Sequence, residues 1–301
     1  MLNLENLTTE KVNQSSAQLD EMSLHERLLA MNKEDQKVAL AVKQVLPTIE
    51  QIIDKVIGSF KSGGRLIYMG AGTSGRLGVL DAAECVPTFG VPPELVVGLI
   101  AGGEQAMTMA VEGAEDDFML GAADLQTLGL TKEDTVIGIA ASGRTPYVIG
   151  GLDFAQKAGA TTATISCNRN AEISKHAAFA IEVDCGAEFL TGSTRLKAGT
   201  AQKLILNMIS TLSMVGIGKV YKNLMVDLKP TNEKLVERSK RIIMQATDCS
   251  YDEAVKAFED SDRTVKTAIV MILTRSNKDK AERLLAASDG FVKNAINIEG
   301  E

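Results

Sequence analysis

Three segments of the chain combine glycine with hydroxyl side chains, and these residue types are suited to holding a phosphate group. They are residues 70–76 (GAGTSGR), 141–145 (ASGRT) and 191–197 (TGSTRLK). Glycine lets the backbone turn sharply and approach a ligand closely, and Ser and Thr hydroxyls donate hydrogen bonds to phosphate oxygens. A helix N-terminus adds unpaired N–H groups and partial positive charge. Each segment alone is more typical of a tight turn with a Ser or Thr cap, but three together favour an anion site.

The first segment also fits the dinucleotide fingerprint G-x-G-x-x-G through Gly70, Gly72 and Gly75. That fingerprint requires an acidic residue about 20 positions further on, at the end of the next strand, to bind the ribose. Here the next predicted strand ends in residues 101–103 (AGG), and the nearest acid is Glu104. Because hydroxyls take the place of the expected acid, the sequence favours a monophosphate over a dinucleotide.

The elements that position these segments are predicted to be strands alternating with helices. Short apolar runs of β type occur at residues 65–69, 95–100, 135–140, 161–166 and 179–183. Such an alternation predicts a parallel sheet with helices on both faces. Ligands bind at the carboxyl ends of strands in these sheets, and each of the three segments is expected to lie at or near a strand end.

Helical patterns flank the predicted sheet. Residues 1–60 are predicted to be helical, with an apolar face whose members recur every three or four positions from Ala39 to Val56. A long helix is expected from Arg195 to Gly218, and its apolar stripe is typical of a core-packing face. The pattern of residues 235–298 suggests several short helices, and a capping box at residues 250–253 (SYDE) marks the start of one of them. The predicted division is therefore 1–60, N-terminal helices; 61–228, an α/β domain; and 229–301, a small all-helical subdomain.

Composition and charge argue against several classes of partner. The net charge is −7, aromatic residues make up 4% and Trp is absent, which disfavours nucleic acid and anionic membranes. The four cysteines and two histidines fit no metal-ligand spacing, so no metal site is expected. Residues 1–20 lack an apolar core typical of a secretory signal, and no run approaches a membrane span, so a cytoplasmic location is expected.

Longer strings around the three segments make the comparison with known families specific. The short strings 72–74 (GTS) and 142–145 (SGRT) resemble the sugar isomerase (SIS) phosphosugar-binding domain. In order and spacing, the chain resembles the bacterial N-acetylmuramic acid 6-phosphate etherases over residues 66–78, 80–85, 111–116, 138–148 and 191–203. This resemblance covers nearly the whole chain and includes residues 231–235 (TNEKL).

The resemblance implies a three-layer α/β/α SIS-type domain and an enzyme that converts N-acetylmuramate 6-phosphate and water into N-acetylglucosamine 6-phosphate and D-lactate. It also implies a cytoplasmic homodimer, active in cell-wall sugar recycling, that needs no metal or organic cofactor. Glu84 matches the family's proton donor and Glu115 its second acid/base residue. The substrate-binding positions that it implies are Gly72, Thr73, Ser74, Ser142, Gly143 and Thr145, with Ser193 and Lys197 from the third segment.

A reaction at two glutamates is chemically sensible. If the sugar ring opens, the proton at C2 is α to an aldehyde; its removal expels lactate from C3, and water then adds at C3. One carboxyl group must act as base and another as acid, with the roles reversing when water adds. The sequence alone does not select the pair, because Glu115 lies in an acidic run typical of a solvated surface and Glu84 is near a helix end. Arg76 and Arg144 fit either an anion-binding role or a structural ion pair.

Two other functions remain open from the sequence. An aldose–ketose phosphate isomerase on the same fold would also move a proton beside a carbonyl group, without releasing lactate. A non-catalytic sugar-phosphate sensor is the other alternative, because the glucokinase regulatory protein shares the G-T-S-G-R loop.

Overall fold

The structure is a computed structural model that describes residues 7–299. Its first elements are two short 3-10 helices, η1 (Thr8–Glu10) and η2 (Gln14–Ser16), and the helices α1 (Leu24–Lys43) and α2 (Leu46–Lys61). Ser23 and Glu26 form a capping box at the start of α1, and Pro47 lies in the first turn of α2. The apolar series predicted as one helix face therefore crosses a break between two helices, where Pro47 favours a new helix start. Residues 1–6 of the predicted helical region lie outside the described residues.

The five predicted strands form one parallel sheet. They are β1 (Leu66–Gly70), β2 (Val96–Ile100), β3 (Thr135–Ile139), β4 (Thr161–Ser166) and β5 (Phe179–Glu182), in the order β2-β1-β3-β4-β5. The central strands β1 and β3 are fully buried, as their continuous apolar runs predict. At the carboxyl edge Gly70 is in register with Ile100 of β2 and with Ile139 of β3.

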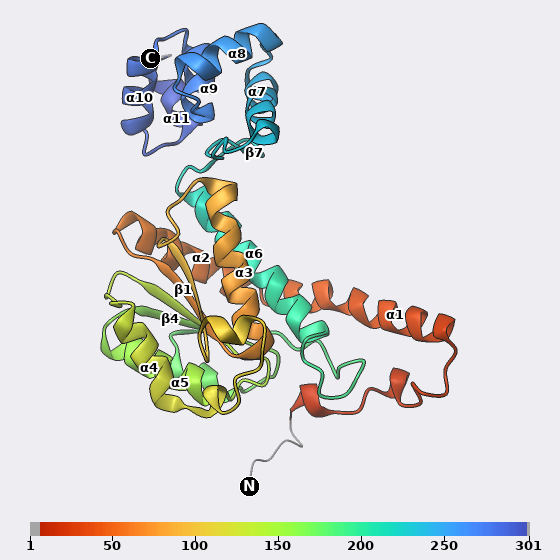
Figure 1. The fold of residues 1–301 in the computed structure, drawn as a ribbon. Coiled ribbons are helices and arrows are strands. Elements are labelled where there is room, and N and C mark those ends of the chain that lie inside the picture. The colour runs from red at the N-terminus through yellow and green to blue at the C-terminus, as the bar shows by residue number, and fades with distance from the viewer. Residues whose placement is uncertain (1–6, 300–301) are drawn as a thin grey trace. The chain divides into compact units, whose positions relative to one another are not determined.

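Helices cover both faces of the sheet (Figure 1). On one face α4 (Phe118–Thr127) and α5 (Pro146–Lys157) pack against apolar side chains of β1 and β3. A Cβ atom on Gly121 of α4 would come within 2.0 Å of the carbonyl oxygen of Tyr147 in α5, so these helices approach closely. On the other face α3 (Gly72–Phe89) lies close to β1, where a Cβ atom on Gly78 would come within 2.9 Å of the Tyr68 Cβ. The predicted three-layer α/β class is confirmed.

Contacts divide the described chain into two compact units. The first holds residues 7–83 and 94–210, and the second holds residues 84–93 and 211–299. The second unit contains the hairpin of β6 (Val220–Tyr221) and β7 (Leu224–Met225) and the helices α7 (Glu233–Thr247), α8 (Tyr251–Asp260), α9 (Val265–Thr274), α10 (Lys278–Ala286) and α11 (Val292–Glu299). The contact-based boundary falls within α6 (Lys197–Gly216), whereas the sequence suggests a division after residue 228.

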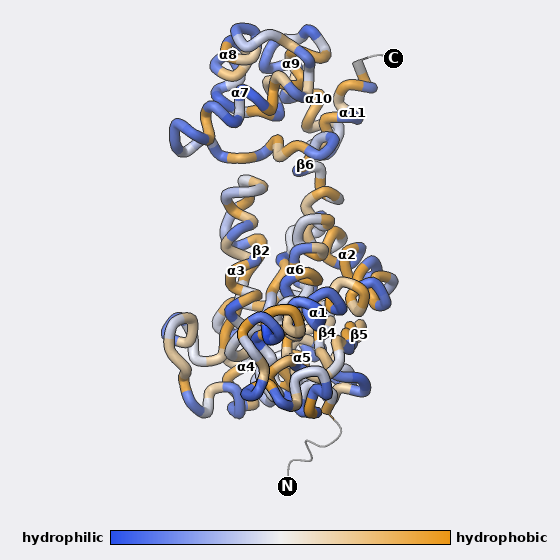
Figure 2. Tube along the Cα trace, turned by 90° about the vertical axis from the view of Figure 1, so that its right-hand side faces the viewer, coloured by the Kyte–Doolittle hydropathy of each residue, from blue (hydrophilic) through white to orange (hydrophobic). Residues whose placement is uncertain are grey.

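The helices of the second unit share one apolar core around Phe258, Ile243 and Ile269. Figure 2 shows hydrophilic and hydrophobic residues alternating along α7, as expected of an amphipathic helix with one face in this core. Ser250 and Glu253 form the predicted capping box at the start of α8. Across residues 7–299, every helix is too short or too polar to cross a membrane.

Candidate active site

The first two glycine–hydroxyl segments lie side by side at the carboxyl edge of the sheet. β1 and β3 are neighbours, and the chain proceeds from β1 to β2 on one side and from β3 to β4 on the other. This reversal of strand order creates a crevice where ligands bind in open α/β sheets. A Cβ atom on Gly70 would lie 2.9 Å from both the Ile139 carbonyl oxygen and the Gly75 backbone nitrogen, so glycine permits the close approach.

The first segment starts a helix directly after β1. Gly72 has a φ of 52°, which favours glycine, and it begins α3. Because the first N–H groups of a helix have no intrahelical partner, the backbone at Gly72, Thr73 and Ser74 can hold an anion. Thr73 is half-buried and Ser74 is buried, so both hydroxyls lie within the structure rather than on its surface.

The second segment turns tightly before α5. Gly143 has a φ of 73° and donates its backbone N–H to the Ala140 carbonyl. A Cβ atom at this position would lie 2.5 Å from the Ala171 Cβ, which is too close for any side chain. Ser142 and Thr145 are half-buried, and Thr145 precedes α5 at the N-cap position. The hydroxyl residues of the two loops therefore lie at the same edge of the sheet, after neighbouring strands.

The third segment leads into α6, but the N-terminus of that helix already holds an anion. The buried carboxylate of Glu188 accepts hydrogen bonds from the backbone N–H groups of Lys197 and Ala198, both at 2.9 Å. Burial raises the pKa of Glu188, and these two hydrogen bonds oppose that effect. Ser193 is half-buried in the preceding turn. The N-terminus of α3 is therefore a better candidate than that of α6 for binding a phosphate at the carboxyl edge of the sheet.

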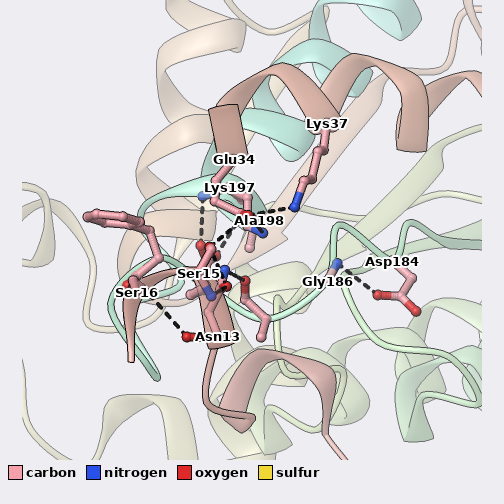
Figure 3. Close-up of polar contacts among 12 residues, drawn as sticks. Asn13, Ser15, Ser16, Glu34, Lys37, Asp184, Gly186, Lys197 and Ala198 are labelled. Atoms are coloured by element: carbon pink, nitrogen blue, oxygen red, sulfur yellow. Dashed lines mark hydrogen bonds and ion pairs between the residues drawn. The ribbon is translucent and has the colours of Figure 1, made fainter. Parts of the chain in front are cut away.

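Lys197 is buried in an ion pair with Glu34 of α1 (Figure 3). Its Nζ lies 2.7 Å from Glu34 Oε2, and both side chains are at most 3% exposed. Burial alone would raise the pKa of Glu34, but hydrogen bonds from Lys197, Lys37, Asn13 and Ser15 lower it to about 2. The ammonium group of Lys197 is thus already paired with a carboxylate of the same chain. Contact of Lys197 with a substrate stays a prediction.

α6 also touches the first segment. The Ser74 hydroxyl donates to the Gln202 side-chain oxygen at 3.0 Å, and a Cβ atom on Gly199 would lie 3.5 Å from the Thr73 methyl group. Gln202 is 1% exposed, and its Nε2 has no hydrogen-bond partner within the described chain. The sequence gives no signal for this role of Gln202, because helix periodicity identifies the apolar face of α6 but not which element each polar residue contacts.

A second polar contact joins the same two helices. Buried Asp81 of α3 accepts hydrogen bonds from Asn207 at 2.9 Å and Ser210 at 3.1 Å. Burial raises the pKa of Asp81, and hydrogen bonds from Ser210, Tyr68 and Asn207 counteract that rise. This network holds α6 against α3 at a point further along both helices than the Ser74–Gln202 contact. The sequence contains no local signal for it.

Glu115 and the first segment line one cavity of about 260 Å³. Glu115 lies on the 3-10 helix η4 (Ala114–Asp116), which follows a left-handed turn at Gly113. The other lining residues are Ala71, Gly72, Arg76, Ala101, Ala106, Ala110, Val111, Glu112 and Gly113. The Glu115 side chain is exposed and therefore accessible to a ligand in this cavity. The fold thus brings one of the two predicted glutamates to the N-terminus of α3.

Glu84 is placed differently. It lies on α3 twelve residues after Gly72, which corresponds to about 18 Å along the helix. Its side chain is exposed and does not line the cavity of Glu115. Cys85, which follows it, is buried, as expected for a small apolar side chain. Along α3, Glu84 is therefore well separated from the glycine–hydroxyl segment that begins this helix.

Comparison with known proteins identifies the family. The chain is 67% identical over 98% of its length to N-acetylmuramic acid 6-phosphate etherase 2 of Enterococcus faecalis, all of which is covered. It is 66% identical over 99% of its length to the whole N-acetylmuramic acid 6-phosphate etherase of Lactococcus lactis subsp. lactis. The chain belongs to the N-acetylmuramic acid 6-phosphate etherase family. The predicted family and the prediction of an enzyme, a carbon–oxygen lyase, are confirmed.

More distant similarity supports the fold of this chain. Residues 48–156 match the family described as the glucokinase regulatory protein N-terminal SIS domain. A phosphoheptose isomerase from Francisella tularensis superposes with a TM-score of 0.53 at 14% identity, covering 64% of this chain and 100% of that one. At that identity the superposition shows a shared fold alone.

Proposed function

We propose that this chain cleaves the D-lactyl ether of N-acetylmuramate 6-phosphate by elimination and water addition, giving N-acetylglucosamine 6-phosphate and D-lactate. The observation that carries the proposal is the cavity that holds Glu115 beside the N-terminus of α3, in a chain of the etherase family. An acid/base residue next to a phosphate-binding helix end suits a reaction on a phosphorylated sugar. The reaction belongs to the recycling of cell-wall amino sugar in the cytoplasm.

The phosphate group is assigned to the two loops at the strand-order reversal. The hydroxyls of Thr73, Ser74, Ser142 and Thr145 and the free N–H groups of α3 surround it, with Gly72 and Gly143 allowing close backbone approach. This assignment is supported by the adjacency of β1 and β3 and by the half-buried or buried state of all four hydroxyl residues. Ser193 and Lys197 of the third segment complete the predicted set.

The carboxyl groups carry out the proton transfers. With the sugar ring open, a carboxylate removes the C2 proton, and a carboxylic acid protonates the ether oxygen as the C3–O bond breaks. Water then adds to C3 of the unsaturated aldehyde, and C2 is reprotonated. Glu115 is one of the two groups, and Glu84 is assigned as the proton donor.

The position of Glu84 supports a homodimer whose two chains complete one another's site. A span of about 18 Å along α3 exceeds the length of a hexose phosphate bound at the helix N-terminus. Glu84 of the partner subunit is therefore assigned to the cavity of Glu115. A second copy of the chain would also cover α1, where the large apolar side chains of Leu24, Leu28, Leu29 and Leu40 are exposed.

Incubation with N-acetylmuramate 6-phosphate in heavy-oxygen water tests the reaction. Elimination with water addition is expected to release D-lactate, measured with a coupled dehydrogenase, and to place the label at C3 of the product sugar. Label in lactate would contradict the elimination route. Conversion of an aldose phosphate to a ketose phosphate without lactate release would favour the isomerase alternative instead.

A further inference from the structure

Arg76 is the one cationic side chain among the residues that line the Glu115 cavity, which also holds the carboxylates of Glu112 and Glu115. Its Nε donates a hydrogen bond to the Met107 carbonyl oxygen at 2.9 Å. None of the ion pairs formed by residues 7–299 includes Arg76. The structural ion pair that the sequence left open for Arg76 is therefore not found in the described chain.

The hydrogen bond to Met107 orients the guanidinium and leaves its terminal nitrogens for a ligand. An arginine side chain has five N–H donors in a planar fork, and one of them is used here. The remaining donors match the two oxygens of a carboxylate in a bidentate arrangement. Glu112 and Glu115 repel an anion, and Arg76 is the side chain lining this cavity that offsets their charge, so a negatively charged group beyond the helix N-terminus is expected to bind beside Arg76.

The proposed substrate carries two anionic groups, the 6-phosphate and the carboxylate of the lactyl group. The hydroxyls and helix N-terminus at the carboxyl edge account for the phosphate. The carboxylate has no ligand among the residues assigned so far. Arg76 lies one helical turn after Gly72 and shares a cavity with Glu115, so it is placed next to both the phosphate site and the acid/base group.

We propose that Arg76 binds the lactyl carboxylate and thereby positions the leaving group for cleavage. The inference rests on the proposed function, because it names a subsite for that substrate. In a lactyl ether a single carbon separates the carboxylate from the ether oxygen. A fork that holds the carboxylate therefore also fixes the oxygen that must be protonated when the C3–O bond breaks. After cleavage the carboxylate departs with lactate, and the product sugar keeps only its phosphate contacts.

The test compares substrate with product sugar in the full chain. Arg76→Met is expected to raise the KM for N-acetylmuramate 6-phosphate by about 10- to 100-fold, the effect of losing hydrogen bonds to a charged group. The inhibition constant of N-acetylglucosamine 6-phosphate should stay unchanged, because this product lacks the carboxylate. Arg76→Lys keeps the charge but not the fork, so it should raise the KM by a smaller factor.

Two outcomes would overturn the assignment. Equal loss of affinity for substrate and product would make Arg76 a phosphate ligand, and an unchanged KM in both variants would leave it no role in binding. The matched control is Arg169→Met, because Arg169 lies beyond β4 and its side chain is 76% exposed. This control should leave the KM unchanged. It thereby distinguishes a direct contact of Arg76 with the substrate from the effect of removing one positive charge anywhere on the chain. Failure of the unmodified chain to release D-lactate would instead overturn the proposed function.

Discussion

At the scale of single residues, the exposed acidic run at residues 112–117 contains one side chain with a predicted chemical role. Glu115→Gln is expected to lower kcat by about 100-fold or more, because the amide cannot transfer a proton and a positioned acid or base contributes about 10²–10⁴ in rate. The change keeps the side-chain shape, so the thermal unfolding temperature should stay the same. D-lactate release under saturating substrate measures the effect.

The neighbouring Asp116→Asn provides the matched control. Asp116 lies on the same 3-10 helix as Glu115 and is exposed, but it does not line the cavity. Its change removes the same charge from the same surface and should leave kcat unchanged. Equal losses of kcat in the two variants would mean that the negative charge of this surface affects turnover, and that Glu115 has no special role.

The position of the two loops after strands β1 and β3 could be predicted from the sequence, whereas most of the residues that they and α6 contact could not. Glycine and hydroxyl residues directly after a strand indicate a candidate phosphate site, because a sharp turn and close backbone approach to a ligand favour these residue types. Gln202 and Glu188 carry no such signature, since their roles depend on which distant segment packs against α6. The selection of Glu115 from an acidic run likewise depends on the cavity that η4 forms with the first loop.

At the scale of elements, the Glu34–Lys197 pair joins α1 to the N-terminus of α6. Lys197→Met should lower the free energy of unfolding by about 3–5 kcal/mol, because it leaves a buried carboxylate without its main partner. Lys37→Met is the matched control, since Lys37 pairs with the same carboxylate but its side chain is 53% exposed. An exposed partner contributes about 0–1 kcal/mol, and urea unfolding distinguishes the two values.

The same pair gives a defined pH dependence. The pKa of Glu34 is about 2 in the folded chain, against an ordinary value of 4.5. As the pH falls from 4.5 towards 2, the unfolded chain takes up this proton before the folded chain does, so folding stability falls. Glu34 thus contributes about 3 kcal/mol above that range. The neutral double variant Glu34→Gln, Lys197→Met should lose this part of the acid dependence, and an unchanged slope would contradict the assignment.

Elements with continuous or periodic apolar patterns were predictable, and those defined by tertiary contacts were not. The five strands follow their apolar runs to within one residue at each end, because both faces of the central strands are buried. The break between α1 and α2 interrupts an apolar series that continues across it, so periodicity alone hides it. The two-residue strands β6 and β7 are too short to produce an alternating pattern.

At the scale of the whole molecule, chain connectivity does not determine the compact units. α3 and α6 each contribute residues to both units, so the contact-based boundaries at residues 83, 93 and 210 fall within or beside helices. In the sequence, the β-type pattern ends before residue 228 and helical patterns follow, so a boundary is predicted there even though the chain folds across it. The same distribution places Glu115 in the first unit and Glu84 in the second.

This separation makes a complementation experiment decisive for the proposed shared site. Glu84→Gln and Glu115→Gln variants should each be inactive alone. In a mixed dimer, one site combines both altered residues, and the other combines the intact Glu115 of one subunit with the intact Glu84 of the other. Random reassembly of equal amounts makes half of the dimers mixed, so about a quarter of the unmodified activity should return. If Glu84 acts on substrate bound to its own chain, every site in the mixture lacks one carboxyl group, and no activity returns.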